Sequence, residues 1–507
     1  MRHLIGLDLG TSACRAGLFD SHGNLVRLAR SAFPVYRPDR AWAEQSPVEW
    51  WAAACEALRE LSAVGVKAED VAGVGLSGQT PGHVLVDSRG EPLGRAIIWQ
   101  DRRATAEAAW MSQTFAPEEL TAYTGLAFVP DSASPPARLL WLRDHDSNWQ
   151  HARWILQPKD YLALRLTGKA TTDSNSAYGL AHLSTGVYEA AYFSRLGLPS
   201  DRLPPVRERT SCVGAVTTRA AQETGLAPGT PIFSGTIDAW CGIVGAGGSA
   251  WQGVDVAGTS EVVALITPEA ASVPGLAMME LGGGLNVVIG PTQLGADAIT
   301  WVRRVFYSEV EETDYATIEG EVASVAPGSG GLVFLPYLLG ERAPIWDDQA
   351  RGAFVGCRIE HGRRHLSRAV YEGGAFAIRH ILSLAEETAN HEISELRIGG
   401  GGSRSDLWNQ IKADVTGKRV ARLKIAETSL LGAAMWAVVG LGLYPDVVTA
   451  GEAMTTVSRW YEPDMLAAER YHELFPAYRE TYPALRDIFH RVSQWSTERD
   501  ESSGGEE

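Results

Sequence analysis

The chain has 507 residues, 45% of them hydrophobic and 21% charged, and a formal net charge of −16. This length exceeds one ordinary hydrophobic core, so we expect two large domains in a globular protein. The acidic balance excludes a broad nucleic-acid-binding face, which needs clustered lysines and arginines. It still allows one anionic ligand, because backbone N–H groups can hold a phosphate locally.

Targeting and redox signals point to the cytoplasm. No apolar run reaches roughly 18 residues, so no transmembrane span is expected. Asp8 and Gly10 interrupt the first apolar stretch too early for a signal peptide. The five cysteines are scattered, contain no CxxC pair and favour a reduced protein without a cysteine metal site; they are Cys14, Cys55, Cys212, Cys241 and Cys357.

The first part of the chain predicts strands that then alternate with helices. Three strands broken by short turns indicate a meander. Ser46, followed three residues later by Glu49, predicts the capped start of a helix. Such alternation is typical of an α/β fold. The expected strands are 3–10, 14–20, 25–33 and 71–78, the helix is 46–61, and 96–110 reads as a strand running into a helix.

The opening pattern recurs near the middle of the chain. Residues 254–267 resemble residues 6–20: an apolar strand, Gly-Thr-Ser, and a second apolar strand. A repeat at half the chain length indicates two related α/β domains, changing near residue 250. We therefore expect an N-terminal domain over 1–247, a C-terminal domain over 248–490, and a polar, disordered tail over 491–507.

The two Gly-Thr-Ser turns, Gly10-Thr11-Ser12 and Gly258-Thr259-Ser260, are candidate phosphate sites. Glycine permits close approach, and the N–H and hydroxyl groups that follow can surround phosphate oxygens. An ordinary hairpin turn is the alternative at each place. Asp8 is suited to Mg²⁺, often through water. Arg15 would place a positive charge near the transferred phosphoryl group.

A third glycine-rich turn lies in residues 397–417, where a strand, four glycines, Ser403 and a helix follow one another. Glycines at such a turn allow a nucleotide to lie against the backbone, beside the N–H donors of the helix. Gly401, Gly402 and Ser403 are therefore candidate nucleotide contacts. A flexible linker is the alternative, and the strong patterns on both flanks argue against it.

Other nucleotide-binding classes fit poorly. Residues 73–78 match GxGxxG, which would indicate a dehydrogenase, but Pro81 and Gly82 follow where a helix should run. The chain has neither a GxxxxGK[ST] P-loop nor the HRD and DFG pair of protein kinases.

Asp238 lies in FSGTIDAWCGIVGAGG, residues 233–248, among small residues. By itself it could be a turn residue bonded to its own backbone, or a catalytic base facing a ligand that approaches closely.

Together these segments resemble the FGGY carbohydrate kinases, and most closely their xylulokinase-like branch, from residue 3 to about 480. GLDLGTS and VAGTSEV resemble the two phosphate motifs, GTIDAWCGIVGAG the segment with the catalytic aspartate, and IGGGGSRSDLW the nucleotide loop. The segments 42–51, 96–103 and 156–168 resemble parts of the sugar domain, and 334–357 with 365–373 resemble the second family signature.

The resemblance implies two actin-like (ribonuclease H-like) ATPase domains around a central cleft, the first holding the sugar and the second ATP. It implies transfer of the γ-phosphoryl of ATP to a sugar hydroxyl, with Asp238 as the base and Asp8 near Mg²⁺. Thr11, Gly258, Thr259 and Ser260 match phosphate contacts, and Gly401, Gly402 and Ser403 match the nucleotide loop. Positioning and charge neutralisation are most of what phosphoryl transfer requires.

Departures from the branch fall where sugar hydroxyls should be recognised. Xylulokinases typically carry Gln-Met-His-Gly where this chain has Gln79-Thr80-Pro81-Gly82, and Asp-Asn where Ala239 follows Asp238. A lost polar partner can change discrimination strongly. Gln79, Thr80, Trp99 and Asp101 are the candidate sugar contacts beside Asp238, with a core tryptophan and a capping aspartate as the alternatives for the last two.

The expected reaction is ATP- and Mg²⁺-dependent phosphorylation of a ketopentose such as xylulose. The alternatives are a kinase for another sugar or polyol, of the ribulose, erythritol or glycerol type, and, more distantly, an actin-like ATPase without a sugar substrate. The expected partner is a small-molecule sugar, with no nucleic acid and no membrane, and a homodimer is compatible with the sequence.

Overall fold

The computed structural model describes residues 3–61, 65–126, 128–269, 273–311 and 314–503. The chain forms two compact units, the first made of Met1–Gly247 and Glu427–Thr455, the second of Gly248–Ala426 and Thr456–Glu507. Within the described ranges, no helix is both long and apolar enough to cross a membrane. The five cysteines are free thiols.

The first unit begins with the predicted meander and helix. Its strands are β1 His3–Leu9, β2 Ala13–Phe19, β3 Leu25–Ala32, β4 Glu44–Gln45, β5 Val71–Gly78, β6 Val84–Val86, β7 Ala96–Ile97, β8 Trp154–Leu156, β9 Cys212–Ala215 and β10 Pro231–Ile237. Its helices are α1 Pro47–Leu61, α2 Thr105–Thr114, α3 Pro117–Thr124, α4 Pro135–His145, α5 Pro158–Thr167, α6 Ala190–Leu196, α7 Thr218–Thr224, α8 Asp238–Gly245, α13 Thr428–Gly440 and α14 Val447–Met454. The strands and the helix expected before residue 80 are confirmed.

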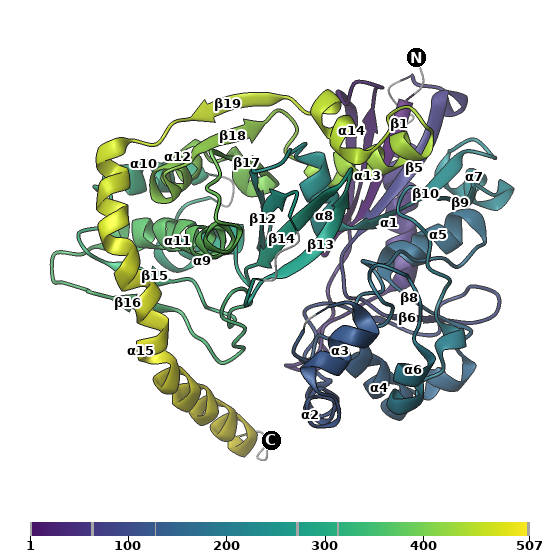
Figure 1. Cartoon of the computed structure of the whole chain (residues 1–507), viewed down its shortest axis with the longest axis horizontal. Coiled ribbons are helices and arrows are strands. Elements are labelled where there is room, and N and C mark those ends of the chain that lie inside the picture. The colour runs from purple at the N-terminus through teal and green to yellow at the C-terminus, as the bar shows by residue number, and fades with distance from the viewer. Residues whose placement is uncertain (1–2, 62–64, 127, 270–272, 312–313, 504–507) are drawn as a thin grey trace. The chain divides into compact units, whose positions relative to one another are not determined.

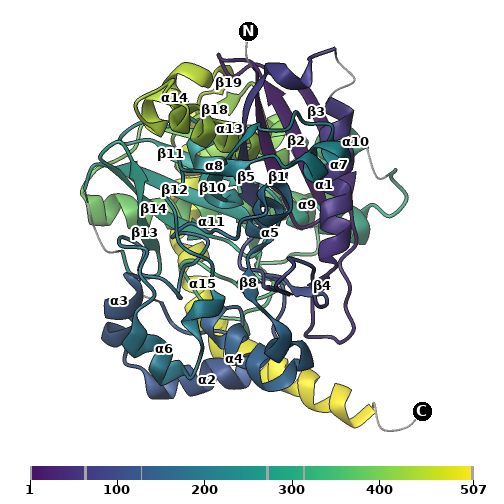
Figure 2. The same cartoon turned by 90° about the vertical axis from the view of Figure 1, so that its right-hand side faces the viewer.

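The main sheet of the first unit has the order β3-β2-β1-β5-β10-β9. β1 pairs antiparallel with β2 and parallel with β5, which pairs parallel with β10. The core packs α1 and α5 against this sheet through residues such as Leu7, Trp50, Leu76 and Tyr161. A second core gathers α2, α4 and α6 around Met111, Leu139 and Tyr192. Figures 1 and 2 show these helices as a group beyond one end of the sheet.

The second unit repeats the first sheet. Its strands are β11 Gly253–Ala257, β12 Glu261–Thr267, β13 Ala277–Gly282, β14 Leu285–Pro291, β15 Val333–Leu335, β16 Ala353–Val355, β17 Glu395–Gly399, β18 Arg419–Leu423 and β19 Val457–Tyr461. Its helices are α9 Ala296–Phe306, α10 Tyr315–Ala323, α11 Arg363–Ala389, α12 Asp406–Thr416 and α15 Met465–Ser503.

The repeat read from the sequence is a repeat of strand pairing. The second sheet has the order β13-β14-β12-β11-β17-β18-β19. β11 pairs antiparallel with β12 and parallel with β17, which pairs parallel with β18. The run β14-β12-β11-β17-β18 thus has the order and directions of β3-β2-β1-β5-β10. The expected α/β class, two domains each built on a mixed sheet, is confirmed.

The expected domain over 248–490 differs from the structure, because Glu427–Thr455 belongs to the first unit. This segment carries α13, which packs on β1, β5 and α8. Glycines permit the close approach: a Cβ on Gly6 would lie 1.9 Å from the Leu430 carbonyl oxygen, and one on Gly75 1.8 Å from that of Ala433. Gly245, seven residues after Asp238, faces the Thr428 carbonyl in the same way. Its small size therefore serves helix packing.

The tail expected to be disordered is also partly helical. α15 extends from Met465 to Ser503 and, in Figure 1, runs along the second unit from the end of β19. α15 contains Pro476 and Pro483, but residues 484–503 contain neither glycine nor proline, and a helix already formed adds such residues at little cost. Residues 504–507 of the expected tail lie outside the described residues.

Candidate active site

The first Gly-Thr-Ser turn carries a partly buried ion pair. The β1–β2 register places Asp8 opposite Arg15. The Arg15 Nε and Nη2 groups donate to Asp8 Oδ2, and the Ser77 hydroxyl on β5 donates to Oδ1 at 2.7 Å. Asp8 has no exposed surface. A Cβ on Gly10 would lie within 4 Å of both charged side chains, so this glycine borders the pair.

Asp238 lies at the end of β10 and is the first residue of α8. Its Oδ1 accepts the Ala239 N–H at 2.7 Å, and the Ser429 hydroxyl of α13 donates to its carbonyl oxygen. Asp8 raises the pKa of Arg15, burial opposes this effect, and Asp238 adds to the increase. The structure therefore brings three predicted residues, Asp8, Arg15 and Asp238, into one electrostatic group.

Two of the predicted sugar contacts are linked to the same turn. The Trp99 indole donates to the Thr11 hydroxyl at 2.9 Å. Gln79 Nε2 donates to Gln45 Oε1 at 2.7 Å, and Gln45 Nε2 donates to the Thr11 carbonyl at 2.5 Å. Gln79 is 2% exposed, and among the described residues its Oε1 has no hydrogen-bond partner. A buried polar atom without a partner is uncommon and marks a place where a ligand group can bind.

The other two candidate sugar contacts are engaged within the protein. The Thr80 hydroxyl donates to Gln157 Oε1 at 3.3 Å. Asp101 is fully buried and accepts the Ala43 N–H at 2.6 Å together with the Arg103 guanidinium. The two carboxylate oxygens therefore fix the backbone around Asp101. This role is similar to that of a capping aspartate, the alternative considered for this residue.

Arg138 holds the segments that carry these candidates. Its guanidinium is fully buried and donates to the carbonyl oxygens of Pro81, Trp99 and Asp101 at 2.9–3.1 Å. Burial lowers its pKa to about 10. His83 lies beside it with both ring nitrogens buried, and burial, reinforced by Arg138, lowers the His83 pKa well below its ordinary value.

The second Gly-Thr-Ser turn joins β11 to β12 in the second unit. Gly258 N–H donates to the Ser260 carbonyl at 2.9 Å and closes the turn. The N–H groups of Gly295 and Ala296, at the start of α9, donate to the carbonyls of Thr259 and Gly258. Thr259 is exposed. The backbone of the turn is thus fixed by the start of α9, while its central residue, Thr259, is exposed to solvent.

The third glycine-rich turn is the strand-to-turn-to-helix unit predicted for residues 397–417. Gly400 and Gly402 pack on β11, where a Cβ would lie 2.4 Å from the Ala257 oxygen and 2.8 Å from the Ala257 Cβ. Gly401 has open space, with nothing within 4 Å of a Cβ. The Ser403 hydroxyl donates to the Gly400 carbonyl at 2.7 Å and is buried. Of the three predicted contacts, Gly401 is therefore the one best exposed to a ligand.

Sequence reasoning missed several partners of these groups. Ser77, which holds Asp8, is one small residue in an apolar strand and carried no local signal. Glu427, which contributes to the raised pKa of Arg15, lies almost two hundred residues further along the chain than Asp238. Gln45 lies in the 42–51 segment that the family resemblance covered, and its amide could have been inferred from that segment.

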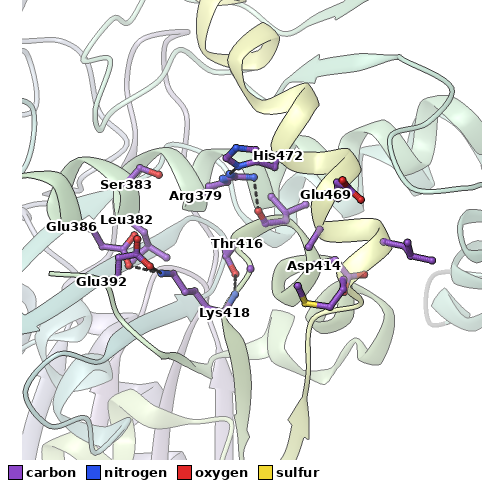
Figure 3. Close-up of a pocket in the computed structure, with 15 residues that line it drawn as sticks. Arg379, Leu382, Ser383, Glu386, Glu392, Asp414, Thr416, Lys418, Glu469 and His472 are labelled. Atoms are coloured by element: carbon purple, nitrogen blue, oxygen red, sulfur yellow. Dashed lines mark hydrogen bonds and ion pairs between the residues drawn. The ribbon is translucent and has the colours of Figure 1, made fainter.

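A pocket of about 700 Å³ in the second unit contains none of the predicted residues (Figure 3). It lies between α11, the end of α12 and the start of α15. Arg379 donates to the Val415 carbonyl at 2.9 Å and contacts His472, and Lys418 pairs with Glu386 at 2.8 Å. Its cationic side chains are therefore occupied by protein partners.

Comparison with known proteins assigns the chain to a family. Residues 3–245 match the N-terminal domain of the FGGY family of carbohydrate kinases, and residues 253–441 match its C-terminal domain. The chain belongs to the FGGY family of carbohydrate kinases. It is an ATP-dependent phosphotransferase, as the resemblance implied.

Kinases similar to this chain match it over nearly its whole length. The xylulose kinase of Bacillus subtilis is 30% identical over 96% of this chain and 98% of its own length. The L-xylulose/3-keto-L-gulonate kinase of Escherichia coli is 30% identical over 97% and 99%. The structure of ligand-bound xylulose kinase from Lactobacillus acidophilus superimposes with a TM-score of 0.86 at 25% identity, covering 97% of this chain and 100% of that one.

These findings decide between the reaction classes left open by the sequence. The prediction of a kinase that acts on a small-molecule sugar is confirmed, and the dehydrogenase and sugar-independent ATPase alternatives are set aside. The GVGLSG segment that matched the dehydrogenase motif lies within β5, and its Gly75 allows α13 to pack closely on the sheet.

Proposed function

We propose that this FGGY kinase transfers the γ-phosphoryl group of ATP to a hydroxyl of a ketopentose such as xylulose, with Asp238 as the general base. The observation that carries the proposal is the group formed by Asp238, Arg15 and Asp8 beside the first Gly-Thr-Ser turn. A base needs hydrogen-bond reach of the attacking hydroxyl, and a fixed cation beside it offsets negative charge on the transferred group. ATP is made and used in the cytoplasm, so the proposal includes that location.

Trp99 and Gln79 would bind the sugar. Trp99 is half-buried and anchored to Thr11 through its indole N–H, and an aromatic ring held in this way would stack against a sugar face. The unpartnered Gln79 Oε1 can accept a hydrogen bond from a sugar hydroxyl. Thr80 and Asp101 enter the proposal by supporting this surface, since their side chains bond Gln157, Ala43 and Arg103.

Mg²⁺, the expected second cofactor, would be held near Asp8. Both carboxylate oxygens already accept hydrogen bonds from Arg15 and Ser77. The donor set therefore fits an ion held through water better than direct ligation, and Mg²⁺ keeps much of its water shell in such sites. Bound Mg²⁺ would neutralise phosphate charge, while Asp8 orders the surrounding water and positions Arg15.

The turns of the second unit fit the nucleotide. Thr259 is exposed, and Gly401 leaves the space that a side chain would fill. In this proposal, Gly258, Thr259 and Ser260 contact phosphate oxygens through backbone and hydroxyl donors. Gly10, Thr11 and Ser12 are the proposed phosphate contacts of the first unit. Gly401 and Gly402 lie against the nucleotide, and Ser403 keeps their turn closed through Gly400.

A kinase for another sugar or a polyol is the second candidate. The observation in its favour is that Thr80 donates to Gln157, and that Ala239 contributes no polar side chain beside Asp238. Both positions depart from the xylulokinase-like pattern, so a ribulose, erythritol or glycerol type of substrate remains the alternative.

A coupled assay of ADP release tests the proposal, with a panel of pentuloses, related sugars and polyols and with Mg²⁺ present or chelated. We expect one ketopentose to stimulate ADP release strongly and the phosphorylated product to appear in equal amount. Stronger stimulation by a polyol would favour the second candidate. ATP hydrolysis unaffected by every compound in the panel would refute both.

The role of Asp238 is tested by Asp238→Asn. We expect turnover to fall by about 10²- to 10⁴-fold, the range for loss of a general base, with nucleotide affinity changed by less than about twofold. Asp144→Asn, at a surface carboxylate of the same unit paired with Arg143, is the matched control and should retain turnover. Turnover of Asp238→Asn close to that of the control would exclude Asp238 as the base.

A further inference from the structure

A buried ionic triad lies behind the second Gly-Thr-Ser turn. Lys412 Nζ of α12 lies 2.6 Å from Asp255 Oδ2 and 2.5 Å from Glu261 Oε1. All three side chains are fully buried. Asp255 is on β11, three residues before Gly258, and Glu261 directly follows Ser260. One ammonium group therefore bonds both ends of the hairpin that carries the turn.

The same helix also holds the glycine-rich turn. Asn409 Nδ2 donates to the Ser403 carbonyl at 2.8 Å, and a Cβ on Gly402 would lie 2.9 Å from the Trp408 ring. Lys412 is one helical turn beyond Trp408, and its ammonium lies 3.9 Å from the centre of that ring. The side chain of Lys412 thus connects the turn before α12 with the hairpin of β11 and β12.

Burying these three charged groups costs folding free energy, so we expect the triad to have a specific role. With both carboxylates ionised the triad carries one net negative charge without solvent. Among the described residues, Asp255 Oδ1 and Glu261 Oε2 have no hydrogen-bond partner. Burial, followed by repulsion from Asp255, raises the Glu261 pKa to about 8 against the attraction of Lys412. Buried ion pairs are often no more stabilising than packed apolar side chains, and their clearest benefit is to select one geometry.

In the first unit, the buried carboxylate beside the Gly-Thr-Ser turn is neutralised in a different way. Asp8 on β1 is neutralised across the hairpin by Arg15 on β2. In the second unit, β11 and β12 contribute two carboxylates, and the cation comes from α12 instead. The first pair keeps its cation beside the turn itself, whereas the second places the cation in the core.

We propose that Lys412 is a positioning residue for the nucleotide: by bonding Asp255 and Glu261 it holds the Gly258–Ser260 turn in one geometry relative to the glycine-rich turn at Gly401. The inference rests on the proposed function, since it requires ATP to contact both turns. A displacement of about 1 Å at such a site can cost on the order of 100-fold in rate. Lys412 contacts no ligand and acts through the two turns.

Glu261 provides the sharpest test, because two substitutions both remove its ionisable carboxyl group and differ in hydrogen bonding. Glu261→Gln keeps a carbonyl acceptor for Lys412, whereas Glu261→Ala removes it. Both leave Lys412 paired with Asp255, so neither strands an unpaired charge. The measurement is the dissociation constant of Mg·ADP by calorimetry without sugar, with the melting temperature of each variant recorded alongside.

We expect Glu261→Ala to weaken Mg·ADP binding by about tenfold or more. Glu261→Gln should bind within about twofold of the native protein. Equal affinity in all three proteins would overturn the proposal, and so would an equal loss in both variants, because removal of the carboxyl group rather than loss of the hydrogen bond to Lys412 would then account for it. A fall in the melting temperature of Glu261→Ala with unchanged affinity would mean that the triad is only structural, and would also overturn it.

Lys412→Met supplies a second test, with Lys418→Met as its control. Lys418 pairs with Glu386 and lines the pocket of Figure 3, away from both turns. We expect Lys412→Met to raise the KM for ATP at least about tenfold and leave the KM for the sugar within about twofold. Lys418→Met should change neither. A shift of both constants together in Lys412→Met would contradict positioning of the nucleotide.

Failure of the proposed function has a different signature. If the native protein binds no Mg·ADP, the nucleotide contacts are wrong and this inference falls with them. If the native protein binds Mg·ADP and the two Glu261 variants do not differ, the nucleotide site stands and only the role of Lys412 is removed.

Discussion

Gly75→Ala tests whether α13 packs on the first sheet as closely as the structure requires. The added Cβ would lie 1.8 Å from the Ala433 carbonyl oxygen and 2.6 Å from its carbon. Non-bonded atoms pack at about 3.5 Å, so α13 or β5 must shift by roughly 1.7 Å. Both obstructing atoms are backbone, and no rotamer change can relieve the contact.

The shift would disturb more than one contact. A Cβ on Gly6 of the neighbouring strand would lie 1.9 Å from the Leu430 carbonyl oxygen of the same helix, so the helix lies on two strands at once. We expect a loss of at least about 3 kcal/mol in the free energy of unfolding, at the upper end of the cost of overpacking. The measurement is urea unfolding followed by far-ultraviolet circular dichroism.

Gly401→Ala is the matched control, because nothing lies within 4 Å of its added Cβ. Its free energy of unfolding should stay within about 0.5 kcal/mol of the native value. Its affinity for Mg·ADP should fall, since the methyl group occupies space that we assign to the nucleotide. A Gly75→Ala protein as stable as this control would refute the close packing of α13 on β5.

Two further predictions concern buried charges. Burial raises the Glu341 pKa to about 7, so the stability that this group contributes is complete below its unfolded value near 4.5 and is lost as the pH rises through 7. Glu341→Gln should therefore flatten the fall in unfolding free energy between pH 5 and 8, and an unchanged slope would exclude Glu341 as its source. Lys159 bonds Asp160 at 2.7 Å and Asp173 at 2.9 Å in the core of the first unit. Lys159→Met should lower the unfolding free energy by about 3–5 kcal/mol, whereas Arg219→Met, at an exposed ion pair, should leave the urea midpoint unchanged.

Local sequence patterns were sufficient to predict the first strands and helix and the class of reaction. Alternation of apolar residues and short turns predicted β1, β2, β3 and β5, and the capped apolar run predicted α1, because these signals depend on neighbours within a few residues. The repeated Gly-Thr-Ser turns predicted two related sheets. The ordered series of motifs was specific enough for the family, which the comparisons confirm.

The roles of individual site residues depended on the fold. Gly401 and Gly402 are neighbours with the same side chain, yet one faces open space and the other packs on Ala257 and Trp408. Asp101 looked available for a sugar, and the structure gives its oxygens to Ala43 and Arg103. Such differences follow from burial and contact, which a motif does not encode.

The sequence by itself determined the two related α/β domains, the three glycine-rich turns and the candidate base, since each is a short-range pattern of residue types. Only the tertiary structure decided which distant groups meet. It returned Glu427–Thr455 to the first unit, where α13 lies against Gly6 and Gly75, and placed Lys412 between Asp255 and Glu261, about 150 residues earlier in the chain. The physical reason is that close packing and charge pairing in a core act between residues far apart in sequence, and no local signal reports them.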